Sequence, residues 1–176
     1  MLPLYLHQSD LLNAARKALM SSTAVVVQLG TGGGKTHLGS TFCQLCVAKG
    51  KRVIFIVHRD FLLDQTMEAF RRVGLDFGVI AAGYTPDYRS PAQIASIDTL
   101  RHRMDKIGKF DLVIVDETHH VLAPSWLSVV QELMRRGAKV LGLTATPWRM
   151  SGAALGSVFT DMVQGPSVRW LIDNGY

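Results

Sequence analysis

Cysteine is scarce in this sequence: the 176 residues contain two, Cys43 and Cys46. So few cysteines exclude a disulfide-stapled secreted scaffold, and we expect a protein of the reducing cytoplasm. Their C-x-x-C spacing also occurs in zinc and redox sites. Because no second pair accompanies them and they lie within a helix-forming stretch, we interpret both as small apolar side chains that pack in or near the core.

Long apolar runs are also missing. No stretch approaches the roughly 18 consecutive apolar residues that a membrane-spanning helix requires. Residues 1–6 lack the basic leader and the small-residue cleavage site of a secretory signal, so we expect no membrane partner. The chain has no repeat, low-complexity tract or internal linker, and its length suits one domain with a substantial core.

What the sequence does contain is an ordinary globular composition with an excess of positive charge. Apolar residues make up 48% and charged residues 19% of the chain, with a formal net charge of +5. Positive charge favours polyanionic partners, although many basic proteins bind no nucleic acid.

Short apolar runs alternate with amphipathic stretches along the chain. We expect strands at 24–29, 53–57, 77–82, 92–97, 110–115 and 139–143, and helices at 7–20, 37–48, 61–72, 124–136 and 167–173, with a short basic helix from Asp98. This order predicts an α/β fold, a doubly wound parallel sheet flanked by helices. Ligands of such sheets bind at the carboxyl ends of the strands, so the polar clusters that follow residues 57, 97, 115 and 143 should meet at one edge.

The segment L-G-T-G-G-G-K-T, residues 29–36, lies between an expected strand and an expected helix, which is the context of a phosphate-binding loop. Glycines let several backbone N–H groups point at one anion, Lys35 can reach the β- and γ-phosphates, and Thr36 can hold Mg²⁺. The strict pattern has glycine where this chain has Leu29, and the alternative is a flexible turn without a ligand. The predicted nucleotide-binding residues of the loop are Thr31, Gly32, Gly33, Gly34, Lys35 and Thr36.

Two carboxylates, Asp116 and Glu117, directly follow the apolar run 112–115. Carboxylates at the end of a buried strand are costly unless a cation meets them. We therefore predict that Asp116, with Thr36, holds Mg²⁺ and that Glu117 orients or deprotonates the attacking water. The alternative is that the pair caps the following helix. Together with the glycine-rich loop, the acidic pair predicts an active site built on Lys35, Asp116 and Glu117.

These residues resemble the motifs of one enzyme family. Asp116-Glu117-Thr118-His119 resembles the D-E-x-H box of superfamily-two helicases and translocases, and Thr144-Ala145-Thr146-Pro147 resembles their third motif. The segments 147–150 and 174–176 are most similar to the XPB-like and type III restriction helicase branch. The resemblance implies that residues 1–176 form one RecA-like ATP-binding domain, the first of the two that such helicases contain.

The resemblance also implies roles for single residues. Gln8 matches a glutamine that reads adenine, and the coupling of hydrolysis to nucleic-acid binding would fall to His119, Thr144 and Thr146. The segments around motifs Ia and Ib imply nucleic-acid contacts by His58, Arg59, Ser96 and Thr99. Each has a plainer alternative: a surface glutamine, a histidine bonded to a nearby carbonyl, turn threonines, or polar side chains that only solvate a strand end.

The implied function is ATP hydrolysis with Mg²⁺, coupled to nucleic acid, with DNA favoured over RNA. The family's second RecA-like domain, which carries an arginine finger worth roughly 10³–10⁵ in rate, is absent from this chain. We expect an excised domain that binds nucleotide, hydrolyses it slowly or not at all, and needs a second domain from the same longer chain or another chain. The rival functions are a P-loop ATPase or kinase acting on a partner other than nucleic acid, and a non-catalytic nucleotide-gated module.

Overall fold

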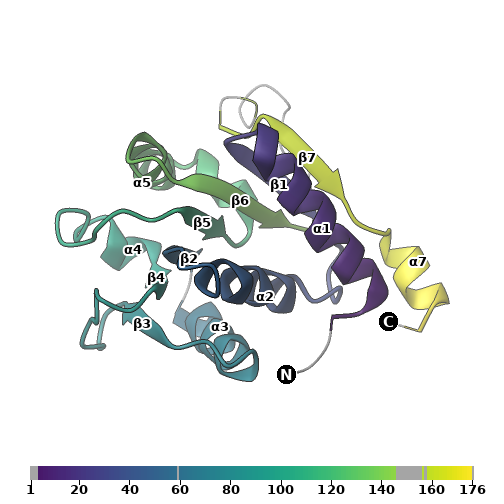
Figure 1. Cartoon of the computed structure of the whole chain (residues 1–176), viewed down its shortest axis with the longest axis horizontal. Helices are drawn as coiled ribbons and strands as arrows, with labels where there is room; N and C mark the ends of the chain where they lie inside the picture. Colours follow the sequence, from purple (N-terminus) through teal and green to yellow (C-terminus); the bar gives the residue numbers. More distant parts are fainter. Residues whose placement is uncertain (1–3, 59, 146–155, 157, 176) are drawn as a thin grey trace.

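The computed structural model describes residues 4–58, 60–145, 156 and 158–175, and within them one parallel sheet forms the centre of the domain (Figure 1). Its seven strands follow the order β3-β4-β2-β5-β6-β1-β7, and every pairing is parallel. The strands are β1 (Ala24–Gln28), β2 (Val53–Val57), β3 (Phe77–Ile80), β4 (Ala92–Ser96), β5 (Leu112–Val115), β6 (Lys139–Thr144) and β7 (Asp161–Gln164). The predicted doubly wound parallel sheet is confirmed.

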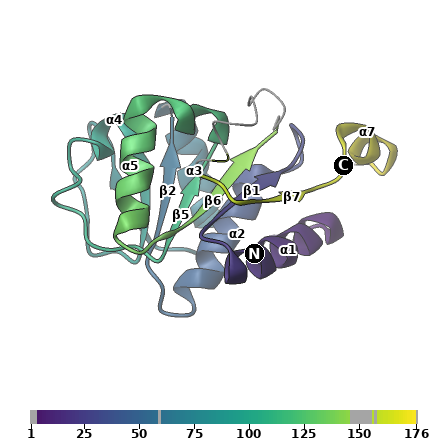
Figure 2. The ribbon, with the colours of Figure 1, turned by 90° about the horizontal axis from the view of Figure 1, so that it is seen from above.

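Helices cover both faces of the sheet, which is why the inner strands are apolar along their whole length. In β1, Val25 and Val27 pack toward α1 (Leu6–Ser21), α2 (Lys35–Val47) and α3 (Asp60–Arg72). Ala24 and Val26 face the opposite layer, which contains α4 (Ile97–Leu100), the 3₁₀ helix η1 (Thr118–Leu122) and α5 (Pro124–Arg135). Figure 2 shows α1 and α2 on one side of the sheet and α4 and α5 on the other.

Three elements differ from the sequence expectation. The strand β7 was not predicted, because at the sheet edge it is largely exposed and has no apolar periodicity. The short 3₁₀ helix η1 was not predicted either. The basic helix expected from Asp98 is wrong: α4 ends at Leu100, and residues 101–102 and 104–106 form turns. The apolar anchors of α4 are Ile97 and Leu100, and a helix continued through the exposed basic residues beyond them would have little apolar surface to bury. The terminal helix is confirmed as α7 (Val168–Asp173).

The cysteines pack as expected from the sequence. Cys43 is buried and Cys46 half-buried, both are free, and burial raises the pKa of each thiol. None of the helices in the described ranges is both long and apolar enough to cross a membrane.

The carboxyl ends of the central strands meet at one edge of the sheet, as expected from their parallel pairing. His58 follows β2, Asp116 follows β5, and Thr144 ends β6, while the glycine-rich loop follows β1. Because β2, β5, β6 and β1 are successive neighbours in the sheet, these groups lie along a single edge.

Candidate active site

The glycine-rich loop turns directly from β1 into α2. Gly32 and Gly34 have φ angles of 82° and 81°, the left-handed region that favours glycine, and Gly34 is the N-cap of α2. The departure from the strict motif has a packing reason: Leu29 is fully buried, and a Cβ on Gly33 would lie 2.7 Å from its Cγ. The loop therefore places the open N-terminus of a 13-residue helix at the sheet edge, a geometry suited to an anion.

Gln8 connects helix α1 to this loop. Its side chain is 2% exposed, its Nε2 donates to the carbonyl of Gly33 at 2.8 Å, and its Oε1 accepts the N–H of Tyr5 at 3.0 Å. The interpretation of Gln8 as a surface residue is therefore wrong. Its contact with adenine stays a prediction.

The acidic pair continues from β5. The Asp116 carboxylate is buried and accepts the N–H of Glu117 at 3.0 Å. Burial and the neighbouring charge of Glu117 raise the pKa of Asp116, against a smaller opposing effect of the Lys35 ammonium. Glu117 has a φ of 50° and is the one non-glycine residue in the described ranges with a positive φ, a strain of the kind that clusters at functional sites. Its side chain makes no capping hydrogen bond to η1, so the capping alternative finds no support for Glu117.

A cavity of about 600 Å³ brings the two motifs together. From the loop it is lined by Thr31, Gly32, Gly34, Lys35 and Thr36, and from the end of β5 by Asp116 and Glu117. Helix α3 provides another wall through Gln65, Glu68 and Arg72. Gly33 of the predicted set lies outside this lining, with its carbonyl bound to Gln8. The cavity combines a helix N-terminus, an ammonium group and two carboxylates, a combination that fits a phosphate ester with a divalent cation.

The residues after the acidic pair link the site to strand β6. The His119 Nδ1 lies 3.3 Å from the Glu117 Oε2, so His119 contacts Glu117. Thr118 links this segment to β6: it is fully buried and donates from its hydroxyl to the carbonyl of Leu143 at 2.9 Å. The coupling role of His119 stays a prediction. Sequence reasoning missed Thr118, whose only signal is its place between Glu117 and His119.

Thr144 connects the end of β6 to the glycine-rich loop. Its side chain is fully buried, and its carbonyl accepts the N–H of Leu29 at 2.9 Å. The backbone of the predicted third motif thus contacts the start of the predicted phosphate-binding loop. Thr146 of the same motif, and residues 147–150, lie outside the described residues.

The predicted nucleic-acid contacts lie farther along the same edge. The His58 ring stacks on the His120 ring with centroids 4.1 Å apart, and the Trp126 ring lies 6.0 Å from it. The His58 Nδ1 is buried without a hydrogen-bond partner among the described residues. Ser96 ends β4 in a buried position and Thr99 is half-buried in α4, while Arg59 lies outside the described residues. Ser96 ends β4 and His58 follows the neighbouring strand β2, so the two lie on adjacent strand ends; their contacts with nucleic acid stay a prediction.

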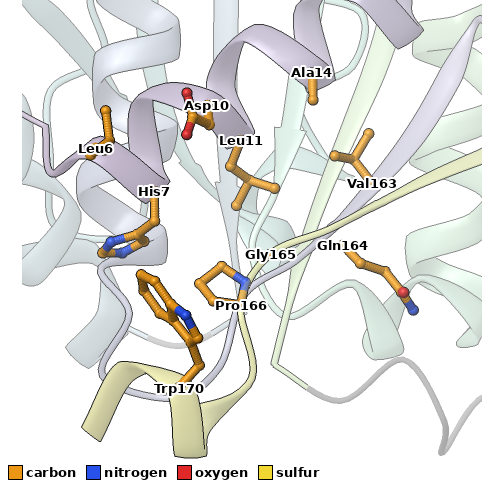
Figure 3. Close-up of a pocket in the computed structure, with 10 residues that line it drawn as sticks. All are labelled: Leu6, His7, Asp10, Leu11, Ala14, Val163, Gln164, Gly165, Pro166 and Trp170. Atoms are coloured by element: carbon orange, nitrogen blue, oxygen red, sulfur yellow. The ribbon is translucent and has the colours of Figure 1, made fainter. Parts of the chain in front are cut away.

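A second cavity, of about 340 Å³, lies between α1 and the segment that joins β7 to α7 (Figure 3). The His7 and Trp170 rings meet edge to face there with centroids 5.9 Å apart. None of the predicted site residues lines this cavity. Helix α7, which borders this cavity through Trp170, packs on the glycine-rich loop. A Cβ added to Gly30 of that loop would lie 2.7 Å from the Val168 Cγ2.

The burial of the Asp116 carboxylate predicts how the thermal stability of the fold depends on pH. Because burial raises its folded-state pKa, the ionised group destabilises the metal-free fold at neutral pH, and this cost disappears as pH falls below the unfolded value near 3.8. We expect Asp116→Asn to melt at a higher temperature than the parent at pH 7, and the two to converge in acid. Thermal unfolding followed by circular dichroism across pH measures the difference.

Asp111 is the matched control, because its environment shifts the pKa in the opposite direction. The Arg52 N–H and the Lys51 ammonium lower the pKa of this carboxyl. Its charge therefore stabilises the fold above the unfolded pKa, and that contribution is lost as pH falls through the folded value. Asp111→Asn should melt at a lower temperature at pH 7. Equal shifts in both variants would contradict the assignment of Asp116 as an uncompensated buried charge.

The buried Thr118 hydroxyl carries a second stability prediction. Thr118→Val keeps the shape of the side chain and removes the hydrogen bond to Leu143, which should lower the free energy of unfolding by about 1 kcal/mol. Thr118→Ser keeps the hydroxyl and loses a methyl group, so it separates the two contributions. Urea unfolding gives both values, and a valine variant as stable as the parent would show that the bond contributes nothing.

Comparisons with known proteins agree with this architecture. Residues 1–149 match the family described as type III restriction enzyme, res subunit. A 51.5 kDa protein of a Lactococcus phage is 31% identical over 149 residues, which cover 85% of this chain and 30% of that protein. The putative ATP-dependent helicase IRC3 of Saccharomyces cerevisiae is 30% identical over 185 residues, covering 96% of this chain and 27% of that protein.

Solved structures share the fold at low sequence identity. The helicase domain of Pyrococcus furiosus Hef superposes with a TM-score of 0.77 at 19% identity, covering 90% of this chain and 37% of that one. The type ISP restriction-modification enzyme LlaGI, solved with a DNA substrate mimic, gives a TM-score of 0.79 at 15% identity and covers 99% of this chain and 21% of that one. The chain spans less than a third of the length of the curated relatives it matches.

Proposed function

Because its residues 1–149 match the family model, the chain belongs to the type III restriction enzyme, res subunit, family, and we propose on this premise that it is the first RecA-like, ATP-binding domain of an ATP-dependent helicase or translocase. The observation that carries the proposal is the single cavity lined by Lys35, Thr36, Asp116 and Glu117. Relatives described as ATP-dependent helicases, and a relative described as a DNA 3'-5' translocase, support the same activity.

The substrate ATP would bind with its phosphates in the glycine-rich loop. The curled backbone directs N–H groups and the N-terminus of α2 into the cavity, and the Lys35 ammonium neutralises phosphate charge. Gln8, on α1, supports the loop through its hydrogen bond to the carbonyl of Gly33. We propose that the same residue also contacts adenine.

The donor set suits Mg²⁺. The Asp116 carboxylate is buried, lines the cavity and forms no ion pair with a described residue, and the Thr36 hydroxyl lines the same cavity. Oxygen ligands of this kind are those that Mg²⁺ prefers. Thr36 and Asp116 would hold the ion, which when bound neutralises developing phosphate charge.

Glu117 is the proposed general base. Its carboxylate is 31% exposed at the cavity wall, so it can accept a proton from a water that attacks the terminal phosphate. The His119 Nδ1 lies within 3.3 Å of the Glu117 Oε2, and we propose that this contact orients the carboxylate. Removal of His119 is therefore expected to affect turnover more than nucleotide affinity.

The coupling to nucleic acid would run along the edge of the sheet. We propose that His58, Arg59, Ser96 and Thr99 contact the polymer and that Thr144 and Thr146 transmit the nucleotide state. The hydrogen bond between Thr144 and Leu29 supports this route, because it joins the third motif to the loop. DNA is the favoured polymer, since relatives and neighbours in fold include enzymes described as acting on or bound to DNA. A second RecA-like domain, in the same longer chain or another, would complete the site.

ATP hydrolysis measured with and without nucleic acid tests the proposal. The chain is assayed together with a second RecA-like domain, and phosphate release is followed with single-stranded DNA, double-stranded DNA, RNA or no polymer. Hydrolysis stimulated by a nucleic acid, most strongly by DNA, is the expected result. Hydrolysis that no polymer stimulates would instead support an ATPase with a different partner, and absence of any turnover would support a non-catalytic binding module.

A further inference from the structure

A third cavity, of about 780 Å³, lies at the edge of the sheet opposite the candidate active site. Asp111 immediately precedes β5, Lys51 lies two residues before the start of β2, and Lys139 begins β6, so this cleft is at the amino ends of the parallel strands. The carboxyl-terminal halves of α1 and α2 form its sides through Arg16, Lys17 and Leu45. We call this surface the basic cleft.

Positive charge dominates the rim of the basic cleft. Five cationic side chains and one carboxylate line it: Arg16, Lys17, Lys49, Lys51, Lys139 and Asp111. Asp111 is neutralised by Lys51 at 2.9 Å, and the Lys139 ammonium donates to the carbonyl of Leu19. Within the described part of the chain, no ion pair involves the remaining three, Arg16, Lys17 and Lys49. All three line the same cleft, around the half-buried Cys46.

The floor of the basic cleft is apolar. Leu19, Phe42 and Leu112 are buried beneath it, and two larger side chains remain accessible at its margin: Met20 at 83% and Leu45 at 36% exposure. An apolar floor inside a charged rim is typical of protein interfaces, in which anchors are buried at the centre and charges select the partner. Nucleic acid fits this cleft less well. The aromatic residue in the lining, Phe42, is buried and not available for stacking on bases.

We propose that the basic cleft binds an acidic amphipathic peptide segment of a protein partner, with its apolar side chains on Met20 and Leu45 and its carboxylates on Arg16, Lys17 and Lys49. Charge complementarity selects this occupant, because an apolar peptide would leave the rim unpaired and a basic one would be repelled. The site does not depend on nucleotide, since its residues are separate from those of the active site.

Binding of a designed probe tests the proposal on the 176-residue chain. The probe is a short fluorescein-labelled peptide that alternates glutamates with leucines and phenylalanines, and its control carries glutamine in place of each glutamate. Fluorescence anisotropy should show saturable binding of the acidic peptide and not of the glutamine control. The bound peptide should also slow alkylation of Cys46 by iodoacetamide, because this thiol is half-buried in the cleft while Cys43 is fully buried.

Charge reversal within and outside the cleft locates the binding. Lys17→Glu combined with Lys49→Glu should weaken peptide binding by about tenfold or more. Arg89→Glu combined with Lys106→Glu makes the same change in net charge at exposed residues outside the cleft, and should change binding by less than about twofold at physiological salt. A far-ultraviolet circular-dichroism spectrum and a melting temperature like those of the parent show that each double variant folds.

Three results would overturn the proposal. The first is equal weakening by the two double variants, which would mean non-specific attraction to a basic protein. The second is binding of the glutamine control as tight as that of the acidic peptide. The third is protection of Cys46 by a single-stranded oligonucleotide and not by the peptide, which would assign the cleft to a phosphate backbone.

Discussion

Lys35→Ala is expected to weaken ATP binding by about 30-fold or more. The ammonium group lines the cavity beside the open end of α2, where it would neutralise the phosphates. Removal of one partner from a close, desolvated charge pair costs about 2–5 kcal/mol, and every 1.4 kcal/mol is about a tenfold change in affinity. Calorimetric titration of the chain with ATP and Mg²⁺ measures the loss.

The control for this prediction is a lysine elsewhere on the surface. Lys106 is exposed in the turns after α4 and lines none of the three cavities, so Lys106→Ala should bind ATP like the parent. If Lys35→Ala also kept the affinity of the parent, the glycine-rich loop would be a turn without a ligand.

Glu117→Gln is expected to keep ATP binding and to lose hydrolysis by about 10²–10⁴-fold, the range typical of general acid–base catalysis. Glutamine has the same shape, so the backbone at φ 50° and the cavity wall are preserved while the proton acceptor is removed. The affinity is measured on the chain alone. The turnover is measured on the chain together with a second RecA-like domain, with nucleic acid present.

The combination of the two readouts separates a catalytic role from a structural one. Loss of both affinity and turnover in Glu117→Gln would assign Glu117 to the architecture of the site. Retention of turnover would remove it from the mechanism and direct attention to Glu68, the other glutamate that lines the cavity.

The parts of the structure that could be predicted from sequence are those that depend on local patterns. Apolar runs such as 53–57 are strands because every one of their side chains is buried between two helical layers. The glycine-rich loop and the acidic pair could be placed at one edge because parallel strands point the same way. Neither inference required knowledge of a specific contact between distant residues.

The parts that could not be predicted depend on contacts between distant segments. The hydrogen bond from Gln8 to Gly33, the bond from Thr118 to Leu143 and the stacking of His58 on His120 leave no periodic trace in the sequence. The edge strand β7 could not be predicted for a different reason. It pairs on one side only and is largely exposed, so burial imposes no apolar pattern on its sequence. The basic residues after Leu100 were also a misleading signal. We predicted a helix that contains them, but α4 ends before them at Leu100.

The most direct test of the central claim is the effect of Mg²⁺ on ATP affinity in Asp116→Asn. The claim is that Lys35 and Asp116 share one pocket for a nucleotide and its metal ion. In the parent chain, Mg²⁺ should tighten ATP binding relative to EDTA. In the variant that gain should vanish, while metal-free ATP still binds through the loop and Lys35. The same gain in the variant and in the parent would contradict the claim.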